Sequence, residues 1–423
     1  MRSSLGFHTL SLSMPLTFDG MHELISDFKK YSKETGEIKM YLCDKKGNRI
    51  EYKNTSRYTP LKLIIQYYKD NHGIEWSVDS YTNYAGFPTY KVSVKINPKI
   101  LGGVHDYITA ATYNDMEAAI ENFNLESEKI SYVLRTFDCY RLDRIDYCIN
   151  FSVDELAPGC SPEQIMTLIR RGDIPQYYEE WQEYSSISHR KKSSPDSFYL
   201  VNKSLGINCY SKLSELKKRS EQRKQNGLPM ISQSVLDTAK NIIRFEVQEK
   251  YRKTYVQSRK AKDSGNLGQN KCKSLLDDLS CNNAVSYYFH KIIGKGDWYT
   301  LNEAVRIIQS KKFNKQKETR LISALRIVNH YHSVAKAKEV FEGDDLKNFR
   351  QNLKDLSCMG INPVTIPKGW GMKHIPNILY AYFDKKDGEN MNKIEINEKI
   401  VKEYLKEMIK TPSKINSPRL FNF

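Results

Sequence analysis

The chain has 423 residues, of which 39% are hydrophobic and 27% charged, a composition typical of a globular protein of two to three domains rather than of a disordered chain. Lysine and arginine number 66 against 50 aspartates and glutamates, and the resulting net charge of +16 favours a polyanionic partner. No apolar run approaches the ~18 residues of a membrane helix, and the eight cysteines are scattered without a C-x-x-C pair. These features disfavour a membrane protein, a structural zinc site and a disulfide framework, and we expect a reduced intracellular compartment.

The first third of the chain alternates the two periodicities of regular structure. Leu10, Leu12 and Met14 recur at a period of two, as in a half-buried strand. Further segments repeat one or the other period: helices are expected at 21–31 and 116–123, and strands at 38–42 and 90–96.

A second set of elements begins near residue 140. Ser161, Pro162 and Gln164 form a capping box with proline at the first helical position, which predicts a helix through Arg171. The remaining elements expected here are strands at 140–151, 197–201, 206–212 and 242–248 and a basic helix at 213–225. Two rounds of strand and helix without a strict β-α-β rhythm predict an α+β fold, with a central, largely antiparallel sheet flanked by helices.

The composition changes after residue 260. The segment at 257–283 is polar and loop-like, and the chain beyond it has helical periodicity. We therefore expect four parts, namely a catalytic domain at 1–260 with its motifs at about 88–255, a linker at 261–283, a mostly helical C-terminal domain at 284–410 and a flexible tail at 411–423.

The positive charge is concentrated between residues 187 and 265, where 18 lysines and arginines face 7 aspartates and glutamates. Three basic runs lie in this region, at 189–192, 217–224 and 250–253, with tyrosines among them. A single run of this kind is equally typical of a solvated helix face. Three together favour contact with the phosphates of a nucleic acid.

Three of the expected strands carry chemically active residues opposite an apolar face. Because side chains two apart on a strand share a face, Asp146, Glu246 and the pair Tyr210 and Lys212 can lie on one polar surface. Two carboxylates can hold Mg²⁺ or Mn²⁺, and a tyrosine oxygen beside them can attack a phosphate if Lys212 eases loss of its proton or grips the phosphate. The alternative is an ordinary solvent face with cross-strand ion pairs.

Two further patterns contain histidines and are weaker indications of a metal site. His330 and His332 match the His-hydrophobe-His pattern of metal-dependent nickases, but they continue a helical stripe, in which residues i and i+2 diverge by roughly 200°. We interpret them as a helix surface or a helix end. His105, which follows two glycines, is expected in a loop.

Four short motifs in order along the chain support the catalytic interpretation. They are Lys95-Ile96-Asn97-Pro98-Lys99-Ile100-Leu101, Arg144-Ile145-Asp146, Ile207-Asn208-Cys209-Tyr210-Ser211-Lys212 with Glu215-Leu216, and Ile243-Arg244-Phe245-Glu246. In these motifs the sequence resembles the replication initiators of filamentous phages, the gene II/X proteins, and it is also similar to initiators of some Gram-positive plasmids. The resemblance covers about 88–255 best.

The resemblance implies an endonuclease of the bacterial cytoplasm that starts rolling-circle replication. It implies Tyr210 as the nucleophile that becomes linked to the 5′ phosphate of one DNA strand, with Lys212 as its companion, and Asp146 and Glu246 as ligands of Mg²⁺ or Mn²⁺. The strand is nicked at an origin, a 3′ hydroxyl is left as a primer, and a later transesterification rejoins the strand. The basic residues in and beside the motifs become candidates for DNA contact: Lys95, Lys99, Arg144, Lys217, Lys218, Arg219 and Arg244.

Other functions remain open from the sequence alone. A conjugative relaxase would use the same chemistry, a non-catalytic DNA-binding regulator would use only the basic surface, and an RNA-binding protein would stack bases on the tyrosines. No glycine-rich phosphate-binding loop with its lysine is present, so we expect a host helicase and polymerase as partners at the origin DNA.

Overall fold

The computed structural model describes residues 4–44, 49–50, 62–67, 72–83, 85–104, 107–180, 183–184, 191–192, 196–225, 227, 229–263 and 275–378. Contacts group Met1–Asn377 into one compact unit. The end of the predicted helical domain, beyond residue 378, and the predicted tail at 411–423 lie outside the described residues. The proposed division of the chain at residues 260 and 283 stays a prediction.

One large sheet dominates the described part of the chain. Its eleven strands run in the order β3-β2-β4-β5-β6-β1-β7-β13-β12-β11-β8, and its paired neighbours are antiparallel. The strands are β1 (Ser4–Leu16), β2 (Ile38–Cys43), β3 (Arg49–Ile50), β4 (Lys62–Tyr67), β5 (Ile74–Thr82), β6 (Pro88–Ile96), β7 (Arg141–Ser152), β8 (Glu179–Glu180), β11 (Ser197–Val201), β12 (Leu205–Ser211) and β13 (Ile242–Lys250). The predicted antiparallel sheet is confirmed.

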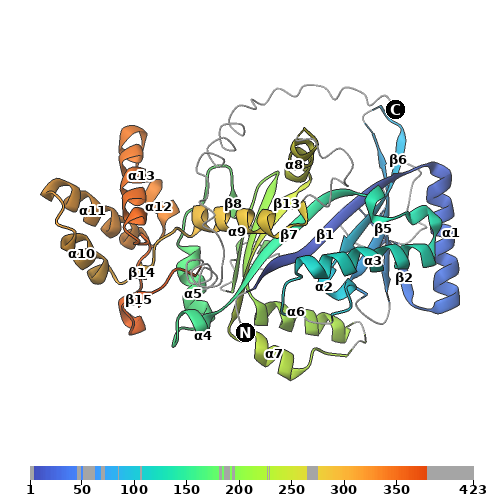
Figure 1. Ribbon diagram of the computed structural model, residues 1–423, viewed down its shortest axis with the longest axis horizontal. Coiled ribbons are helices and arrows are strands. Elements are labelled where there is room, and N and C mark those ends of the chain that lie inside the picture. Colours follow the sequence, from blue (N-terminus) through green and yellow to red (C-terminus); the bar gives the residue numbers. More distant parts are fainter. Residues whose placement is uncertain are drawn as a thin grey trace. The chain divides into compact units, whose positions relative to one another are not determined.

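Smaller sheets and the helices complete the architecture (Figure 1). Two-stranded sheets pair β9 (Glu183–Tyr184) with β10 (Lys191–Lys192) and β14 (Trp298–Tyr299) with β15 (His374–Ile375). The α-helices are α1 (Phe18–Thr35), α2 (Pro98–Leu101), α3 (Tyr113–Ile130), α4 (Val153–Leu156), α5 (Pro162–Arg170), α6 (Lys212–Gln225), α7 (Gln233–Ala239), α8 (Tyr251–Asp263), α9 (Asp278–Ile292), α10 (Leu301–Ser310), α11 (Lys315–Tyr331), α12 (Val334–Lys338) and α13 (Gly343–Cys358). The molecule is an α+β protein with a mostly helical C-terminal region, as predicted.

One face of the large sheet carries the apolar core. Phe245 of β13 packs edge-on against Phe289 of α9, with ring centroids 5.3 Å apart, and α9 also contacts β1 and β7. On the other half of the sheet, Trp76 of β5 packs against Phe28 of α1. Each of these fully buried side chains contributes about 1.5–3 kcal/mol through removal of apolar surface from water. The opposite face of the sheet is polar and carries the candidate site.

The hairpin of β11 and β12 ends one residue earlier than the alternation of the sequence predicts. Lys212, expected on the strand, is instead the first residue of α6. The hydroxyl of Ser211 accepts a hydrogen bond from the backbone N–H of Ser214, and a serine at this place is favoured because it satisfies a free donor of the first helical turn. The strand therefore ends at Ser211 and the chain turns into the helix.

Within the described residues, no helix is long and apolar enough to cross a bilayer.

Candidate active site

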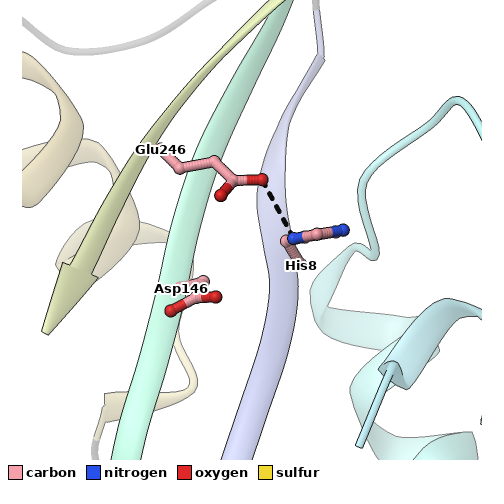
Figure 2. Close-up of side chains that lie close together, drawn as sticks. All are labelled: His8, Asp146 and Glu246. Carbon is pink, nitrogen blue, oxygen red and sulfur yellow. Dashed lines mark ion pairs between the residues drawn. The ribbon is translucent and has the colours of Figure 1, made fainter. Parts of the chain in front are cut away.

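Three side chains on neighbouring strands converge on one point of the polar face. Asp146 comes from β7, Glu246 from β13 and His8 from β1, and one ligand atom of each lies within 4.8 Å of the others (Figure 2). The imidazole nitrogen Nδ1 of His8 is 2.9 Å from Oε1 of Glu246. Within the described residues this is the one group of three or more such side chains whose ligand atoms lie this close together.

The register of the sheet explains how the two carboxylates meet. Glu246 pairs directly with Cys148, and Gln248 pairs with Asp146, so the two acids are diagonal neighbours on adjacent strands. Diagonal pairs on one face are close enough for side-chain contact. The pattern of alternate polar residues in β7 and β13 therefore brings together two of the residues that the sequence analysis singled out.

A β-bulge in β1 turns His8 toward these acids. Phe7 pairs with Tyr147 and Thr9 pairs with Asp146, which leaves His8 as an extra residue between them. A bulge of this kind re-aims a side chain, and bulges are frequent beside active sites. Without it, His8 would share the face of Leu10 and point into the core.

Gly6 supports the bulge by allowing a close backbone approach. The backbone of Phe7 exchanges two hydrogen bonds with Ala111, of 2.8 and 2.9 Å. A Cβ atom on Gly6 would lie only 2.2 Å from the carbonyl oxygen of Ala111. Glycine is therefore the residue that fits between β1 and the segment around Ala111.

The two acids are buried and sit in different electrostatic surroundings. The guanidinium of Arg144 makes two hydrogen bonds of 2.6 Å to the carboxylate of Asp146. Burial raises the pKa of Asp146 above its usual range, although Arg144 opposes this shift. Burial also acts on Glu246, but His8, Arg244 and Tyr210 outweigh it and hold the pKa of Glu246 below its usual range.

Tyr210 points its hydroxyl at the same cluster. The hydroxyl donates a 2.6 Å hydrogen bond to Oε1 of Glu246. Burial raises the pKa of Tyr210 well above its usual value, and the charge of Glu246 adds to this effect. At neutral pH the tyrosine is therefore a phenol whose proton is held by the carboxylate.

Lys212 is buried next to the tyrosine. Its Nζ atom lies 2.7 Å from Glu215 and 5.9 Å from the centre of the Tyr210 ring. Burial lowers the pKa of Lys212 to about 8, with a further contribution from Arg244, while Glu215 opposes the shift. At pH 7 Lys212 remains a cation, and it loses this charge in the mildly alkaline range.

Arg244 connects the site to the segment around Ile108. Its side chain is 1% exposed and donates 2.6 Å hydrogen bonds to the side-chain oxygen of Asn150 and to the carbonyl oxygen of Ile108. The amide nitrogen of Asn150 donates to the same carbonyl. Arg244, a predicted DNA contact, is thus occupied within the protein, and its contact with DNA stays a prediction.

Access to the cluster is from the side of His8 and Arg144. Their side chains are 26% and 36% exposed, whereas Asp146 and Glu246 are almost fully buried. Ser11 pairs with Arg144 on one side and with Lys95 on the other, so these residues share the polar face. A hollow of about 250 Å³ begins there, lined by Ser11, Leu12, Lys62, Glu75, Ser77, Asp79, Lys91, Ser93, Val94, Lys95 and Asp143.

The other predicted site residues are more dispersed. Lys95 is exposed on β6, and Lys217 and Lys218 are exposed on α6. Lys99 forms a 3.0 Å ion pair with Asp115, and the guanidinium of Arg219 lies over the ring of Tyr107. None of these residues joins the cluster of His8, Asp146 and Glu246.

The histidines considered from sequence fall elsewhere. His330 lies in the last turn of α11, and His332 follows it in a left-handed conformation with a φ of 54°. Neither belongs to a cluster of metal-binding side chains within the described residues. His105 lies outside the described residues.

The donor set of the cluster suits a divalent cation. Carboxylate oxygens are the preferred ligands of Mg²⁺ and Mn²⁺, and an imidazole nitrogen extends the preference toward transition metals such as Mn²⁺. Each carboxylate oxygen of Asp146 retains a lone pair beyond the one that faces Arg144. Two buried acids side by side favour positive charge, and a cation can add to the charge that Arg144 and Arg244 already supply. The residues therefore fit such an ion.

Comparison with known proteins gives one weak likeness. No family model and no curated protein matches the sequence. The chain is weakly similar, with a TM-score of 0.26 and 8% identity over 62% of this chain and 80% of the other, to a solved structure described as the rolling circle replication initiator protein from Geobacillus stearothermophilus. At these values the likeness establishes neither a shared fold nor a shared activity.

Proposed function

We propose that this protein is a rolling-circle replication initiator that nicks one strand of DNA with Tyr210 as the nucleophile. One observation carries the proposal: the hydroxyl of Tyr210 is hydrogen-bonded to Glu246, which is also part of a three-residue cluster suited to a divalent cation. A tyrosine and a cation site that share a carboxylate are what in-line transfer of a phosphodiester to a tyrosine needs. The ordered motifs that resemble phage initiators point to the same reaction.

Each side chain of the site has a role in this reaction. Glu246 accepts the hydrogen bond of the Tyr210 hydroxyl and relays the phenol proton to solvent as the phenol oxygen attacks the phosphorus atom. The bond between phosphorus and the 3′ oxygen breaks, the 3′ oxygen takes a proton from solvent, and the 5′ phosphate stays on the tyrosine. Because this linkage conserves the energy of the phosphodiester, reversal of the same steps rejoins a strand without a nucleotide cofactor.

The cations of the site balance the negative charge of the phosphate. Lys212 is protonated at neutral pH and lies beside the Tyr210 ring, where it can hold a phosphate oxygen. Arg144 keeps Asp146 oriented toward the cluster. His8, Asp146 and Glu246 would hold Mg²⁺ or Mn²⁺, which when bound polarises the scissile phosphate and offsets the charge that develops on it.

Single-stranded or locally melted origin DNA is the substrate form that this site favours. The cluster is reached from the exposed side of His8 and Arg144, next to a polar hollow that is lined by three lysines and three carboxylates. A single strand can lay its backbone along such a polar face and present one phosphate to Tyr210. Host helicase and polymerase remain expected partners.

The test is formation of a covalent adduct between the protein and a labelled single-stranded oligonucleotide from the origin of its own replicon. The full-length protein is incubated with the oligonucleotide and Mn²⁺ and analysed on a denaturing gel. We expect a protein–DNA band with the wild type and none with Tyr210→Phe or with EDTA. The Phe variant keeps the ring, and Glu246 keeps its contact with His8, so we expect it to fold.

Tyr31→Phe is the matched control. The Tyr31 hydroxyl lies on α1 and donates a 2.8 Å hydrogen bond to Glu37, so it forms a tyrosine–carboxylate pair outside the cluster. Its loss should leave the adduct unchanged. An adduct that survives Tyr210→Phe contradicts the nucleophile assignment, and intact binding without any adduct favours a non-catalytic DNA-binding protein.

A further inference from the structure

The C-terminal helices carry a strongly basic surface that the active site does not use. α10 ends at Ser310, α11 begins at Lys315, and the two helices pack against each other. The four residues between them form a tight turn in which Lys312 has a left-handed φ of 49°. Asn314 closes the turn, since its side chain accepts a 2.8 Å hydrogen bond from the backbone N–H of Lys317. A short turn between two packed helices is the connection found in helix–turn–helix units.

α11 is buried along one side and exposed along the other. The buried stripe packs against the neighbouring helices and consists of Leu321, Ala324, Leu325 and Val328. The exposed stripe is polar throughout and consists of Gln316, Thr319, Arg320, Ser323 and Arg326. The spacing of these residues, three or four apart, places them on a single face of the helix.

The exposed stripe has the residue types that read base edges in the major groove. Arginine pairs with guanine, glutamine pairs with adenine, and serine and threonine bond to either. The only carboxylate of α11, Glu318, is partly buried and lies off this stripe. A helix of 17 residues is long enough to present several of these side chains to one groove.

Unpaired cations surround the stripe. Lys311, Lys312 and Lys315 are exposed at the turn, next to Arg320 and Arg326. Over the described part of the chain, none of these five side chains forms an ion pair. On α13, by contrast, exposed Asp344 and Asp345 accompany the lysines, and Asp344 is paired with Lys347 at 2.8 Å. Of these two parts of the helical region, the α10–α11 unit is therefore the one with a surplus of positive charge.

From this geometry we infer that the α10–α11 unit binds duplex DNA, with α11 in the major groove and the turn lysines on the flanking phosphates. The inference rests on the proposed function, in which the active site takes single-stranded origin DNA. The α10–α11 unit is a separate surface and takes the double-stranded form of that DNA. Charge complementarity favours a nucleic acid, and a protruding polar helix fits the major groove of B-form DNA better than the deep, narrow groove of RNA.

The test is selection of binding sites by the full-length protein from 40-base-pair duplexes with a randomised core, followed by fluorescence anisotropy on the selected duplex. Arg320→Ala should weaken binding to the selected duplex about 10-fold or more and relax the preference at one position. Lys311→Ala and Lys312→Ala should weaken binding to all duplexes and each reduce the slope of log K against log salt by about 1. Arg350 is an exposed arginine of α13, and Arg350→Ala should change neither the affinity for the duplexes nor the salt dependence of binding.

Two further measurements separate this inference from the nicking reaction. Arg320→Ala should form the covalent adduct with a single-stranded oligonucleotide as the wild type does, and Tyr210→Phe should bind the selected duplex as the wild type does. Equal thermal midpoints for Arg320→Ala, Arg350→Ala and the wild type show that folding is intact. The inference is overturned if no duplex is enriched, if Arg320→Ala binds like the wild type, or if duplex RNA binds more tightly than the selected DNA.

Discussion

A single oxygen of Glu246 links the tyrosine to the candidate ligand set. Oε1 of Glu246 accepts the 2.6 Å hydrogen bond from the Tyr210 hydroxyl and lies 2.9 Å from Nδ1 of His8. A change at His8 therefore alters the charge at the oxygen that holds the tyrosine proton. Tyr210 and the candidate ligands therefore form one network of polar contacts in which each member affects the others.

Replacement of His8 is expected to weaken cation binding. His8→Ala removes one of the three candidate ligands, and we expect the affinity for Mn²⁺, measured by isothermal titration calorimetry, to fall at least 10-fold. The stabilisation of the wild type by Mn²⁺ should fall with it, because a ligand at 100 times its dissociation constant adds about 2.7 kcal/mol to the free energy of unfolding.

His22→Ala is the matched control for His8. His22 lies on the exposed side of α1 and contacts Phe18, away from the cluster. Mn²⁺ affinity should be unchanged in this variant. Equal affinity in His8→Ala and the wild type would show that His8 is not a ligand and would leave only the two carboxylates.

A methyl group at Gly6 is expected to disturb the bulge that aims His8. Its Cβ atom would lie 2.2 Å from the carbonyl oxygen of Ala111, so β1 or the 107–111 segment must move. We expect Gly6→Ala to lower the free energy of unfolding in urea by about 1–3 kcal/mol, the usual cost of overpacking, and to reduce Mn²⁺ affinity. Gly369→Ala, with nothing within 4 Å of its Cβ, should leave both unchanged. A stable Gly6→Ala protein with normal affinity would contradict the role of this close approach.

The sequence predicts the sheet and two of the three residues of the cluster because their strands are regular. Asp146 and Glu246 follow a strict alternation with apolar neighbours such as Ile145 and Phe245, and the register of β7 and β13 then brings them together. A period of two is a direct consequence of strand geometry, so it needs no knowledge of tertiary contacts.

His8 is missed because its strand breaks that period. The alternation of Leu10, Leu12 and Met14 predicts that residue 8 lies in the core. Because of the bulge, Phe7 lies there instead. The signal was the three-residue spacing between the apolar Phe7 and Leu10. Whether such a spacing is a bulge or an exposed phenylalanine depends on the partner strand, in this case the pairing of Phe7 with Tyr147.

The rate of adduct formation is expected to fall as the pH rises through about 8. Burial lowers the pKa of Lys212 to about 8, so Lys212 is charged below this pH and neutral above it. The pKa of Tyr210 is raised well above 10, so its ionisation does not contribute in this range. If protonated Lys212 holds the phosphate, the single-turnover rate declines between pH 7 and 9.

Lys212→Arg tests this assignment, because arginine keeps its charge at pH 9. In this variant the single-turnover rate of adduct formation should not decline between pH 7 and 9, whatever its absolute value. Lys212→Met should be slow at all pH values. A rate that rises through pH 8 in the wild type would contradict the role of Lys212 as a cation and would indicate that it acts as a base.

The stability of the protein is expected to fall as the pH is lowered from 6.5 to about 4, partly because of His290 on α9. Burial, with a contribution from Lys295, lowers the pKa of His290 to about 4, whereas the unfolded chain has the usual value near 6.5. Between these values the unfolded state binds more protons than the folded state, so the stabilising contribution of neutral His290 is present above 6.5 and is lost toward 4. Between pH 7 and pH 5 this loss amounts to about 2 kcal/mol in the free energy of unfolding. Urea denaturation at the two pH values measures it, and His290→Gln should show a smaller decrease by about that amount. An equal decrease in the variant and the wild type would mean that His290 is protonated in the folded protein or that its neighbours rearrange to accept the charge.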